Sequence, residues 1–426
     1  MMLASMLAAF VANVLLGLPL FVCLLLAAVV GFFFVDLSLL PRMLPQQLFA
    51  GIDVFSLMAI PLFILAGNLM NSAGLTPRLI DLAKALVGHL RGGLGYVNVV
   101  SSVFFAGVNG SAVADTSALG SLLVPAMKKE GYSTAYAAGL TAGSSLIGPI
   151  IPPSIFMILY ASLTNTSVGD LFLAGVIPGL ILGVAFMIMN WAYARKAQLA
   201  VTGTRPTLRG VTVALFQAAP ALMAPFIIVA GIVFGFVTPT ESGALIVAYA
   251  VAAGLFSRHL DWQGIKSAVC ETTRLSCAIF LIIAASAVVS WLLAFAQVPS
   301  EFSVLLAPFS DSPIITLLLL SLITFVTGML MEEVSALMLL TPVFLPVAMQ
   351  AGVDPVHLGI IVTMNITIAL ITPPMGACVF VAAAVSKLDL SVMFRAIWPF
   401  VLVALCTLIL LILLPQITLF LPELLG

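Results

Sequence analysis

Two short polar segments, residues 104–116 and 327–335, lie inside apolar stretches of this 426-residue chain, and both carry carboxylates. The first contains Asp115, and the second contains the adjacent pair Glu332 and Glu333. A polar, glycine-containing segment between two apolar arms is typical of the tip of a helical hairpin. A helix that ends inside a membrane protein has unpaired carbonyls that can coordinate Na⁺, and the amides that open the next helix can bind a carboxylate. The two segments therefore indicate ion coupling or recognition of a polar substrate, because a carboxylate at membrane depth is costly to keep.

A purely structural role for these carboxylates remains open. Asp115 is expected in the first turn of the second hairpin arm, where a negative charge also stabilises the helix dipole. Either Glu332 or Glu333 could simply cap the arm that follows it.

Two further segments, residues 143–154 and 365–376, are expected to interrupt helices. The first reads Gly-Ser-Ser-Leu-Ile-Gly-Pro-Ile-Ile-Pro-Pro-Ser, and the second ends in Thr-Pro-Pro-Met-Gly. A continuous helix does not accommodate prolines at this density, so the chain should unwind and free carbonyls that can face the hairpin tips. A plain proline kink is the alternative interpretation.

The two sets of segments are related by an internal repeat with an offset of 221 residues. Phe104 recurs as Phe325, Gly107 as Gly328, and the pair 152–153 as 373–374, with no gap over about 75 positions. The shared residues are mostly Gly and Pro, which control backbone geometry. Duplicated helix-breaking units in a membrane protein are typical of the binding site of a secondary transporter.

The composition places the chain among polytopic membrane proteins. It is 63% hydrophobic and only 7% charged, with a mean hydropathy of +1.28, whereas soluble proteins carry roughly 25% charged residues. Lipid requires every span to be a helix or a broken helix. The predicted fold class is therefore an all-α polytopic membrane protein with an inverted repeat, two re-entrant helical hairpins and two broken transmembrane helices. The five cysteines and three histidines form no metal or catalytic motif, so we expect neither an enzyme nor a nucleic-acid-binding protein.

The apolar stretches predict the order of the spans. The candidates are residues 5–35, 54–73, 92–108, 134–165 with a break, 170–194, 211–236, 239–257, 272–296, 313–330, 355–386 with a break, and 389–422. The shorter segments 112–128 and 333–349 are expected to be second hairpin arms that do not cross the bilayer.

Three stretches, residues 36–52, 74–91 and 258–274, are too polar to span. They are expected to be amphipathic helices along the membrane interface, with ordinary loops as the alternative. Residues 238–241, Thr-Pro-Thr-Glu, read as a capping box that starts the next span.

The distribution of positive charge predicts that the repeat is inverted. The densest basic loop, residues 195–209, should be cytoplasmic by the positive-inside rule, whereas the equivalent C-terminus has no Lys or Arg. Lys128 and Lys129 likewise become Met349 and Gln350 in the second copy. Equivalent ends of the two copies are therefore expected on opposite sides, with the C-terminus external.

Four motifs in this order resemble the large membrane subunit of TRAP (tripartite ATP-independent periplasmic) transporters over essentially the whole chain. They are Gly-x-Asn-Gly-Ser-x-x-Ala-Asp-Thr from Gly107, Gly-Pro-Ile-Ile-Pro-Pro-Ser from Gly148, Thr-Pro-Thr-Glu from Thr238, and Thr-Pro-Pro-Met-Gly from Thr372. The resemblance implies an elevator-type transporter in the bacterial inner membrane. Residues 92–194 and 313–426 would form the mobile transport domain, and residues 1–91 and 195–312 the scaffold with its interfacial arms.

The same resemblance implies partners and cofactors. A small membrane subunit of about four helices, as a separate chain, and a periplasmic substrate-binding protein would assemble with this chain. A Na⁺ gradient, acting through two Na⁺ sites, would drive uptake of an organic anion such as a C4-dicarboxylate, a keto acid or a sialic acid.

The resemblance also assigns site residues by position. One Na⁺ site would use Gly107, Asn109, Ser145 and Gly148, although Ser or Gly is equally common at position 109. The second would use Gly328, Thr372, Met375 and Gly376. The substrate chamber would be lined by Ser111, Asp115, Ser154, Glu332 and Glu333.

Other function classes remain to be weighed. A carrier of the same superfamily that works without a binding protein, for dicarboxylates or oxyanions, would show the same hairpins, and so would a channel. An intramembrane enzyme would need a Ser/His dyad or an HExxH run, and the sequence has neither.

Overall fold

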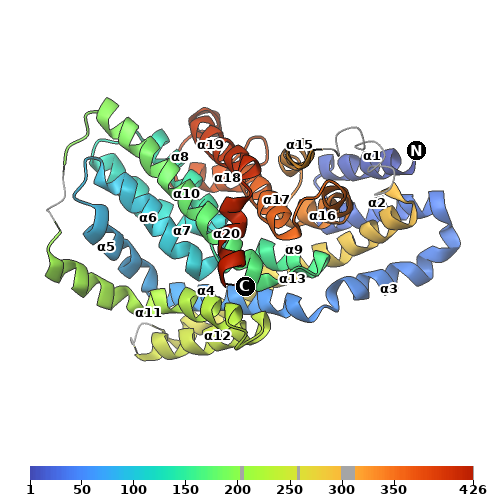
Figure 1. The fold of residues 1–426 in the computed structure, drawn as a ribbon, viewed down its shortest axis with the longest axis horizontal. Coiled ribbons are helices and arrows are strands. Elements are labelled where there is room, and N and C mark those ends of the chain that lie inside the picture. The colour runs from blue at the N-terminus through green and yellow to red at the C-terminus, as the bar shows by residue number, and fades with distance from the viewer. Residues whose placement is uncertain (202–205, 257–259, 299–311, 426) are drawn as a thin grey trace.

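The computed structural model describes residues 1–426 except 202–205, 257–259, 299–311 and 426, and it also leaves the Asn109 side chain undescribed. All regular elements within this described part are helices (Figure 1). Seven of these helices are long and apolar enough to cross a membrane. The prediction of an all-helical polytopic membrane protein is therefore confirmed.

The first predicted span, residues 5–35, is wrong as a single element. Helix α1 (Met2–Leu15) ends at a turn in which Gly17 has a φ of 74°, and α2 (Leu20–Val35) begins after Pro19. A left-handed glycine followed by a proline cannot continue a helix. The two short helices pack against each other instead.

Two of the three polar stretches form separate helices. A 3₁₀ turn, η1 (Leu37–Leu39), leads into α3 (Leu40–Ile52), and α5 (Leu75–Val87) follows a left-handed glycine. The third expectation is wrong, because the chain from Trp262 onward is the first part of the 34-residue helix α13 (Trp262–Phe295). Asp261 caps that helix by accepting from the Gly264 N–H at 2.7 Å, and the helix then continues without a break into the apolar span.

The long helices of the N-terminal and middle regions pack together. Helix α4 (Ala59–Ser72), preceded by the 3₁₀ turn η2 (Phe55–Met58), packs against α12 (Pro239–Phe256) and α13. Helix α13 also packs along α2 and α3, and α11 (Leu208–Val233) packs against α5 and α12.

The first repeat forms a helical hairpin and a broken helix. Hairpin 1 consists of α6 (Gly93–Asn109) and α7 (Ala112–Lys129). Broken helix 1 consists of α8 (Thr134–Ser144), the 3₁₀ turn η3 (Ser145–Ile147) and α9 (Ile155–Thr164), and the long α10 (Val168–Lys196) follows. Because residues 148–154 lie outside any helix, the segment is a true break rather than a kink.

The second repeat has the same order. Hairpin 2 consists of α15 (Pro313–Gly328) and α16 (Glu333–Gln350), and broken helix 2 consists of α17 (Pro355–Ala369) and α18 (Ala377–Ser386). The predicted span 389–422 is wrong as one element, because it divides into α19 (Leu390–Leu413) and α20 (Gln416–Leu425) at Pro415.

The offset between the repeats changes by one residue at the breaks. Left-handed Gly131 and Gly352, which precede the broken helices, keep the offset of 221. After the breaks, left-handed Asn165 corresponds to Lys387, an offset of 222. The ungapped match therefore does not hold for α18, and the second break contains one additional residue.

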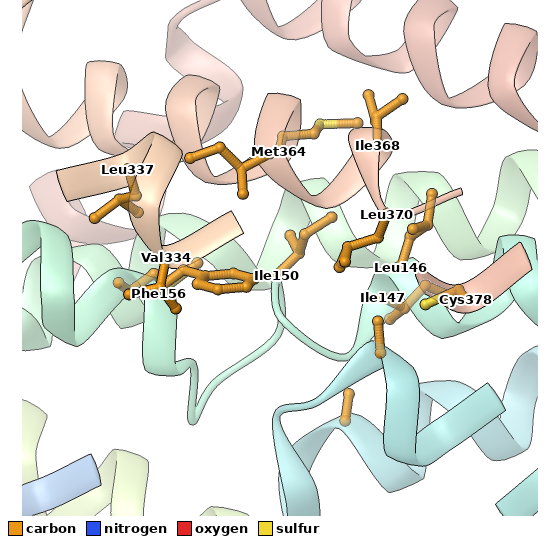
Figure 2. Packing of buried hydrophobic residues seen from close by; sticks show 14 of the residues in the cluster. Leu146, Ile147, Ile150, Phe156, Val334, Leu337, Met364, Ile368, Leu370 and Cys378 are labelled. Atoms are coloured by element: carbon orange, nitrogen blue, oxygen red, sulfur yellow. The ribbon is translucent and has the colours of Figure 1, made fainter. Parts of the chain in front are cut away.

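The two repeats exchange their second half-helices. Helix α18 of repeat 2 packs on α7 of repeat 1, and reciprocally α9 packs on α16. Figure 2 shows Phe156 of α9 beside Val334 of α16, and Cys378 of α18 beside Ile147. Reciprocal contacts of this kind are the mark of two units related by a two-fold axis.

The two broken helices run in opposite directions. The turn before α8 lies beside the end of α10, where the Ser133 N–H donates to the Tyr193 hydroxyl at 3.2 Å. Near the far end of the same broken helix, the Tyr160 hydroxyl donates to the carbonyl of Pro355, the first residue of α17, at 2.7 Å. Broken helix 2 therefore starts where broken helix 1 finishes, and its second half α18 packs back against α8, where broken helix 1 begins.

Candidate functional site

The tip of hairpin 1 is packed against the first break. Gly110 ends α6 with a φ of 58°, and a Cβ there would lie 2.5 Å from the carbonyl oxygen of Pro153. A Cβ on Gly148 would lie 3.6 Å from the carbonyl carbon of Ser111. The tip and the break that the sequence predicted to face each other are therefore in direct contact.

This junction supplies neutral oxygen atoms of the kind that Na⁺ prefers. In the described structure, no backbone N–H donates to the carbonyls of Gly107 or Val108 at the end of α6. The Ser145 hydroxyl donates to the Ala142 carbonyl at 2.7 Å and lies 2.7 Å from the Thr116 hydroxyl. Helix-end carbonyls beside buried hydroxyls fit an alkali cation, so the residues predicted for the first Na⁺ site are compatible with it. The structure gives no side-chain position for Asn109.

The second junction is formed by hairpin 2 and the second break. A Cβ on Gly328 would lie 2.9 Å from the Cβ of Ala369. The buried Thr372 hydroxyl donates to the Ile368 carbonyl at 2.8 Å and retains lone pairs. The carbonyl of Gly376 already accepts from the N–H groups that open α18, which makes it the weakest of the predicted ligands. Met375 is 47% exposed and its side chain ends in a soft thioether, so its backbone carbonyl is the donor that suits Na⁺.

The three carboxylates have different local roles. Glu332 is the N-cap of α16 and accepts from the Ser335 N–H at 3.0 Å, so the capping interpretation is correct for this residue. Glu333 follows it in the first turn of the same helix. Asp115 is 2% exposed, and although the Ser102 hydroxyl lies near it, neither of its oxygens has a donor at hydrogen-bond geometry in the described part of the protein. A buried carboxylate without a donor requires a compensating partner, such as a cation, a proton or a substrate group.

The start of α18 brings the two halves of the site together. The Cys378 thiol lies beside the hydroxyls of Thr116 and Ser145, and close enough to Asp115 and Glu333 to interact with both electrostatically. Cys378 and Thr116 were not predicted as site residues. Their only sequence signal is position, since Thr116 ends the first tip motif and Cys378 comes two residues after the second break motif.

Four helix N-termini therefore meet in the centre of the protein: those of α7, α9, α16 and α18. Ser111 caps α7 by accepting from the Ala114 N–H at 3.4 Å, and the buried Ser154 caps α9 by accepting from the Met157 N–H at 3.3 Å. Gly110, next to Ser111, lies against Ser154, and Cys378 at the start of α18 lies close enough to Asp115 of α7 and Glu333 of α16 to interact with both. Helix N-termini carry partial positive charge and are suited to binding anions.

The Thr-Pro-Thr-Glu motif lies away from this centre and has the predicted structural role. The Thr238 N–H donates to the Glu241 carboxylate at 2.7 Å, and the Glu241 N–H donates to the Thr238 hydroxyl at 3.3 Å. This reciprocal pair is a capping box at the start of α12. A cavity of about 330 Å³ lies next to it, lined by Ser56, Ser167, Asp170 and the turn between α11 and α12.

Basic residues gather at one end of repeat 1. Lys128 and Lys129 end α7, and Arg195 and Lys196 end α10. The Tyr132 hydroxyl, just after α7, donates to the Gly92 carbonyl at 2.7 Å and so brings Arg91 to the same end. Arg205 of the basic loop lies outside the described residues.

Comparison with known families agrees with these features. Residues 7–417 match the family described as "Tripartite ATP-independent periplasmic transporter, DctM component". The sialic acid TRAP transporter large permease protein SiaM of Vibrio cholerae is 39% identical over 380 residues, 89% of each chain. The 2,3-diketo-L-gulonate large permease YiaN of Escherichia coli is 36% identical and covers 94% of each chain. The C4-dicarboxylate large permease DctM of Pseudomonas aeruginosa is 37% identical and covers 90% of each.

Solved structures with the same fold are transporters with low sequence identity. The YdaH transporter of Alcanivorax borkumensis superposes with a TM-score of 0.64 at 14% identity, covering 88% of each chain. MtrF of Neisseria gonorrhoeae superposes with a TM-score of 0.63 at 14% identity, covering 95% of this chain and 94% of the other. These likenesses concern the fold alone. The family match covers nearly the whole chain and identifies a transporter component, so the alternative of an intramembrane enzyme is excluded. The chain belongs to the DctM component family of the tripartite ATP-independent periplasmic transporters.

Proposed function

We propose that this chain is the permease of a Na⁺-coupled system for uptake of a small organic anion across the bacterial inner membrane. In this proposal, a periplasmic binding protein delivers the substrate, and a small membrane subunit completes the scaffold. The observation that carries the proposal is the meeting of four helix N-termini around Ser111, Ser154, Asp115 and the start of α16. Such an arrangement favours a negatively charged substrate.

The charge balance of the centre supports coupling to a cation. Asp115, Glu332 and Glu333 lie in or beside the site, whereas residues 104–116, 143–154, 327–335 and 365–376 contain no Lys or Arg. An anionic substrate would be repelled by these carboxylates unless positive charge enters with it. Na⁺ bound by the helix-end carbonyls of both junctions would supply that charge, and anion affinity would then depend on Na⁺.

The substrate is proposed to be a carboxylate. Relatives with 36–39% identity are named for sialic acid, 2,3-diketo-L-gulonate and C4-dicarboxylates, all of which are carboxylates. The resemblance favours delivery by a binding protein over the alternative of a carrier that works without one.

An elevator mechanism fits the architecture. The first hairpin arms, α6 and α15, have 17 and 16 residues. At about 1.5 Å per residue they are shorter than the roughly 30 Å hydrocarbon core, which supports arms that enter the membrane without crossing it, whereas the second arm α16 is among the seven helices long enough to cross. Because the hairpins interlock with the broken helices of both repeats, they would move together against α11, α12 and α13.

The inverted insertion can be tested by labelling single cysteines in intact cells and in inside-out vesicles. Lys196 lies at the basic end of α10, whereas Thr418 of α20 contacts His357 near the opposite end, with an Nδ1 to Oγ1 distance of 2.7 Å. We expect Lys196→Cys to react only from the cytoplasmic side and Glu423→Cys only from outside. Labelling of both from the same side would contradict the inverted topology.

The central test is uptake by proteoliposomes that contain the chain, its small subunit and the binding protein. Radiolabelled N-acetylneuraminate, 2,3-diketogulonate and succinate are offered with an inward Na⁺ gradient, and choline replaces Na⁺ at fixed pH in the control. We expect saturable uptake of one of these acids that falls at least tenfold in choline and does not respond to ATP. Undiminished uptake in choline would overturn Na⁺ coupling, and non-saturable flux would indicate a channel.

A further inference from the structure

Hairpin 1 is joined to broken helix 1 by a chain of buried side-chain hydrogen bonds. The Asn98 amide donates to the Thr141 hydroxyl at 2.7 Å, and its carbonyl oxygen accepts from the Ser144 hydroxyl at 3.1 Å. The Ser102 hydroxyl donates to Ser144 at 3.0 Å. These four side chains, from α6 and α8, are at most 1% exposed and are called the polar ladder below.

The second arm of hairpin 1 is joined to the same broken helix. The Thr116 hydroxyl of α7 lies 2.7 Å from the Ser145 hydroxyl, and Ser145 directly follows the last residue of α8. Both arms of the hairpin are therefore hydrogen-bonded to the helix that forms the first break.

The equivalent positions of repeat 2 are almost all hydrocarbon. At the offset of 221 residues, Asn98, Ser102, Thr141, Thr116 and Ser145 become Leu319, Ile323, Val362, Leu337 and Ile366. Only the position of Ser144 remains polar, as Asn365, whose amide donates to the Ser321 hydroxyl at 3.0 Å. The Asn365–Ser321 bond between α17 and α15 is thus a counterpart of the Ser102–Ser144 bond, whereas the positions of the Asn98–Thr141 and Thr116–Ser145 bonds are apolar in repeat 2.

This difference has a mechanical consequence. Buried hydrogen bonds whose members are all partnered hold helices in one arrangement, and lipid offers no water to replace them when they part. Apolar contacts between helices can slide without leaving an unpaired polar group. Separating hairpin 1 from broken helix 1 would leave several buried polar groups unpaired. Separating hairpin 2 from broken helix 2 would break the hydrogen bond between Ser321 and Asn365.

We propose that hairpin 1 and broken helix 1 move as one rigid unit, and that hairpin 2 is the gate that opens to admit Na⁺ and substrate. Asn98, Ser102, Thr141 and Ser144 are then positioning residues, which keep the first tip in contact with its break while hairpin 2 moves. This inference rests on the transport activity proposed above.

Two matched disulfides test the proposal in the complete transport complex. The pair Ser102→Cys with Ser144→Cys joins hairpin 1 to α8, and the pair Ser321→Cys with Asn365→Cys joins hairpin 2 to α17. Asn365 is the repeat equivalent of Ser144, and the hydrogen-bonding atoms are 3.0 Å apart in both pairs. Because the Asn Nδ2 atom lies one bond beyond the position of a cysteine Sγ, disulfide formation is verified in each pair before uptake is compared. The four native cysteines outside the site, Cys23, Cys270, Cys277 and Cys406, are first replaced by serine or alanine, and the buried Cys378 is kept.

Each variant is measured in its reduced and oxidised forms, with the acid that the uptake panel identifies as transported. We expect oxidation of the hairpin 1 pair to leave uptake within about twofold of the reduced form. Oxidation of the hairpin 2 pair should lower uptake at least tenfold, with recovery on reduction. Equal effects of the two disulfides, or inhibition by the hairpin 1 pair alone, would overturn the proposal. The reduced proteins test Na⁺ coupling separately. Uptake by the reduced proteins that does not require Na⁺ would contradict the proposed function, but it would leave the comparison of the two hairpins valid.

Hydrogen exchange of the complex with Na⁺ alone as the probe gives an independent readout. Removal of Na⁺ should increase amide exchange in residues 325–337 and leave residues 104–116 unchanged. The double variant Asn98→Leu with Thr141→Val introduces the residue types found at the equivalent positions of repeat 2. In this variant, amide exchange in residues 104–116 should also become Na⁺-dependent. An equal response of both tips in the unmodified protein, or no change in the variant, would contradict the assigned roles.

Discussion

The hydroxyl of Thr116 lies 2.7 Å from the hydroxyl of Ser145, and this contact joins the second arm of hairpin 1 to the point where broken helix 1 unwinds. Both residues are fully buried. Thr116 also contacts the Ala112 carbonyl at 2.8 Å, so its hydroxyl fixes Ser145 relative to the first turn of α7. The predicted ion ligand and the helix that opens the anion site are therefore held together by one side chain.

Replacing Thr116 by valine should lower the apparent affinity for Na⁺ and have little effect on the stability of the fold. Valine keeps the shape of threonine and removes a hydrogen bond worth ~1 kcal/mol, which corresponds to a five- to tenfold rise in the Na⁺ concentration needed for half-maximal uptake. Uptake titrated with Na⁺ measures the effect. Ser121→Ala is the control, because this exposed serine on the same helix bonds only to the Ala118 carbonyl. An unchanged Na⁺ titration in Thr116→Val would show that the contact does not position an ion ligand.

Replacing Asp115 by asparagine should reduce uptake at least tenfold while the protein still folds. The change keeps the size of the side chain and removes the charge of a carboxylate that is 2% exposed and lacks donors in the described structure. If that charge is balanced by a cation or a substrate group, transport depends on it. Uptake and thermal stability are measured together. Asp81→Asn, at an exposed residue that pairs with Lys84 at 3.3 Å, should leave both unchanged. Wild-type uptake by Asp115→Asn would assign the residue a structural role only.

Replacing Gly110 by alanine should disrupt the contact between the first tip and the first break. The position has a φ of 58°, which costs a non-glycine residue ~1 kcal/mol, and the new Cβ would also press against the Pro153 carbonyl oxygen at 2.5 Å. Gly352→Ala is the matched control, because Gly352 has a φ of 79° and no atom within 4 Å of a new Cβ. Gly110→Ala should therefore lose more uptake and more thermal stability than Gly352→Ala. Equal losses would mean that the tip is not held by Pro153.

Removing the cap of α17 should destabilise the second broken helix. The Asp354 carboxylate accepts from the Val356 N–H at 2.7 Å and the His357 N–H at 3.2 Å. Loss of such a cap costs ~1 kcal/mol, so Asp354→Ala should lower the Tm of the purified protein by a few degrees. Asp389 occupies the same position before α19 without a side-chain capping bond, and Asp389→Ala should leave the Tm unchanged. A larger effect at Asp389 would contradict the capping assignment.

Much of the fold follows from the sequence, because it depends on local chemistry. The composition requires a helical membrane protein, and Gly110 with Ser111, or the prolines at 152–153, impose a tip and a break on their own segments. The same local logic fails at Gly17 and Pro415, where short turns divide stretches that are apolar throughout. It also fails at residues 262–274, where polar side chains occupy the start of a long continuous helix.

What the tertiary structure alone decides is which residues from different segments meet. The sequence could not distinguish Glu332, which caps its own helix, from Asp115, which has no donor in the described residues. Nor could it place Cys378 beside Thr116, because residues more than 250 positions apart leave no periodic pattern when they come together. The duplicated Gly and Pro positions determined two similar backbones. The exchange of half-helices between them, and a polar ladder of which repeat 2 keeps one hydrogen bond, emerge when the whole chain packs.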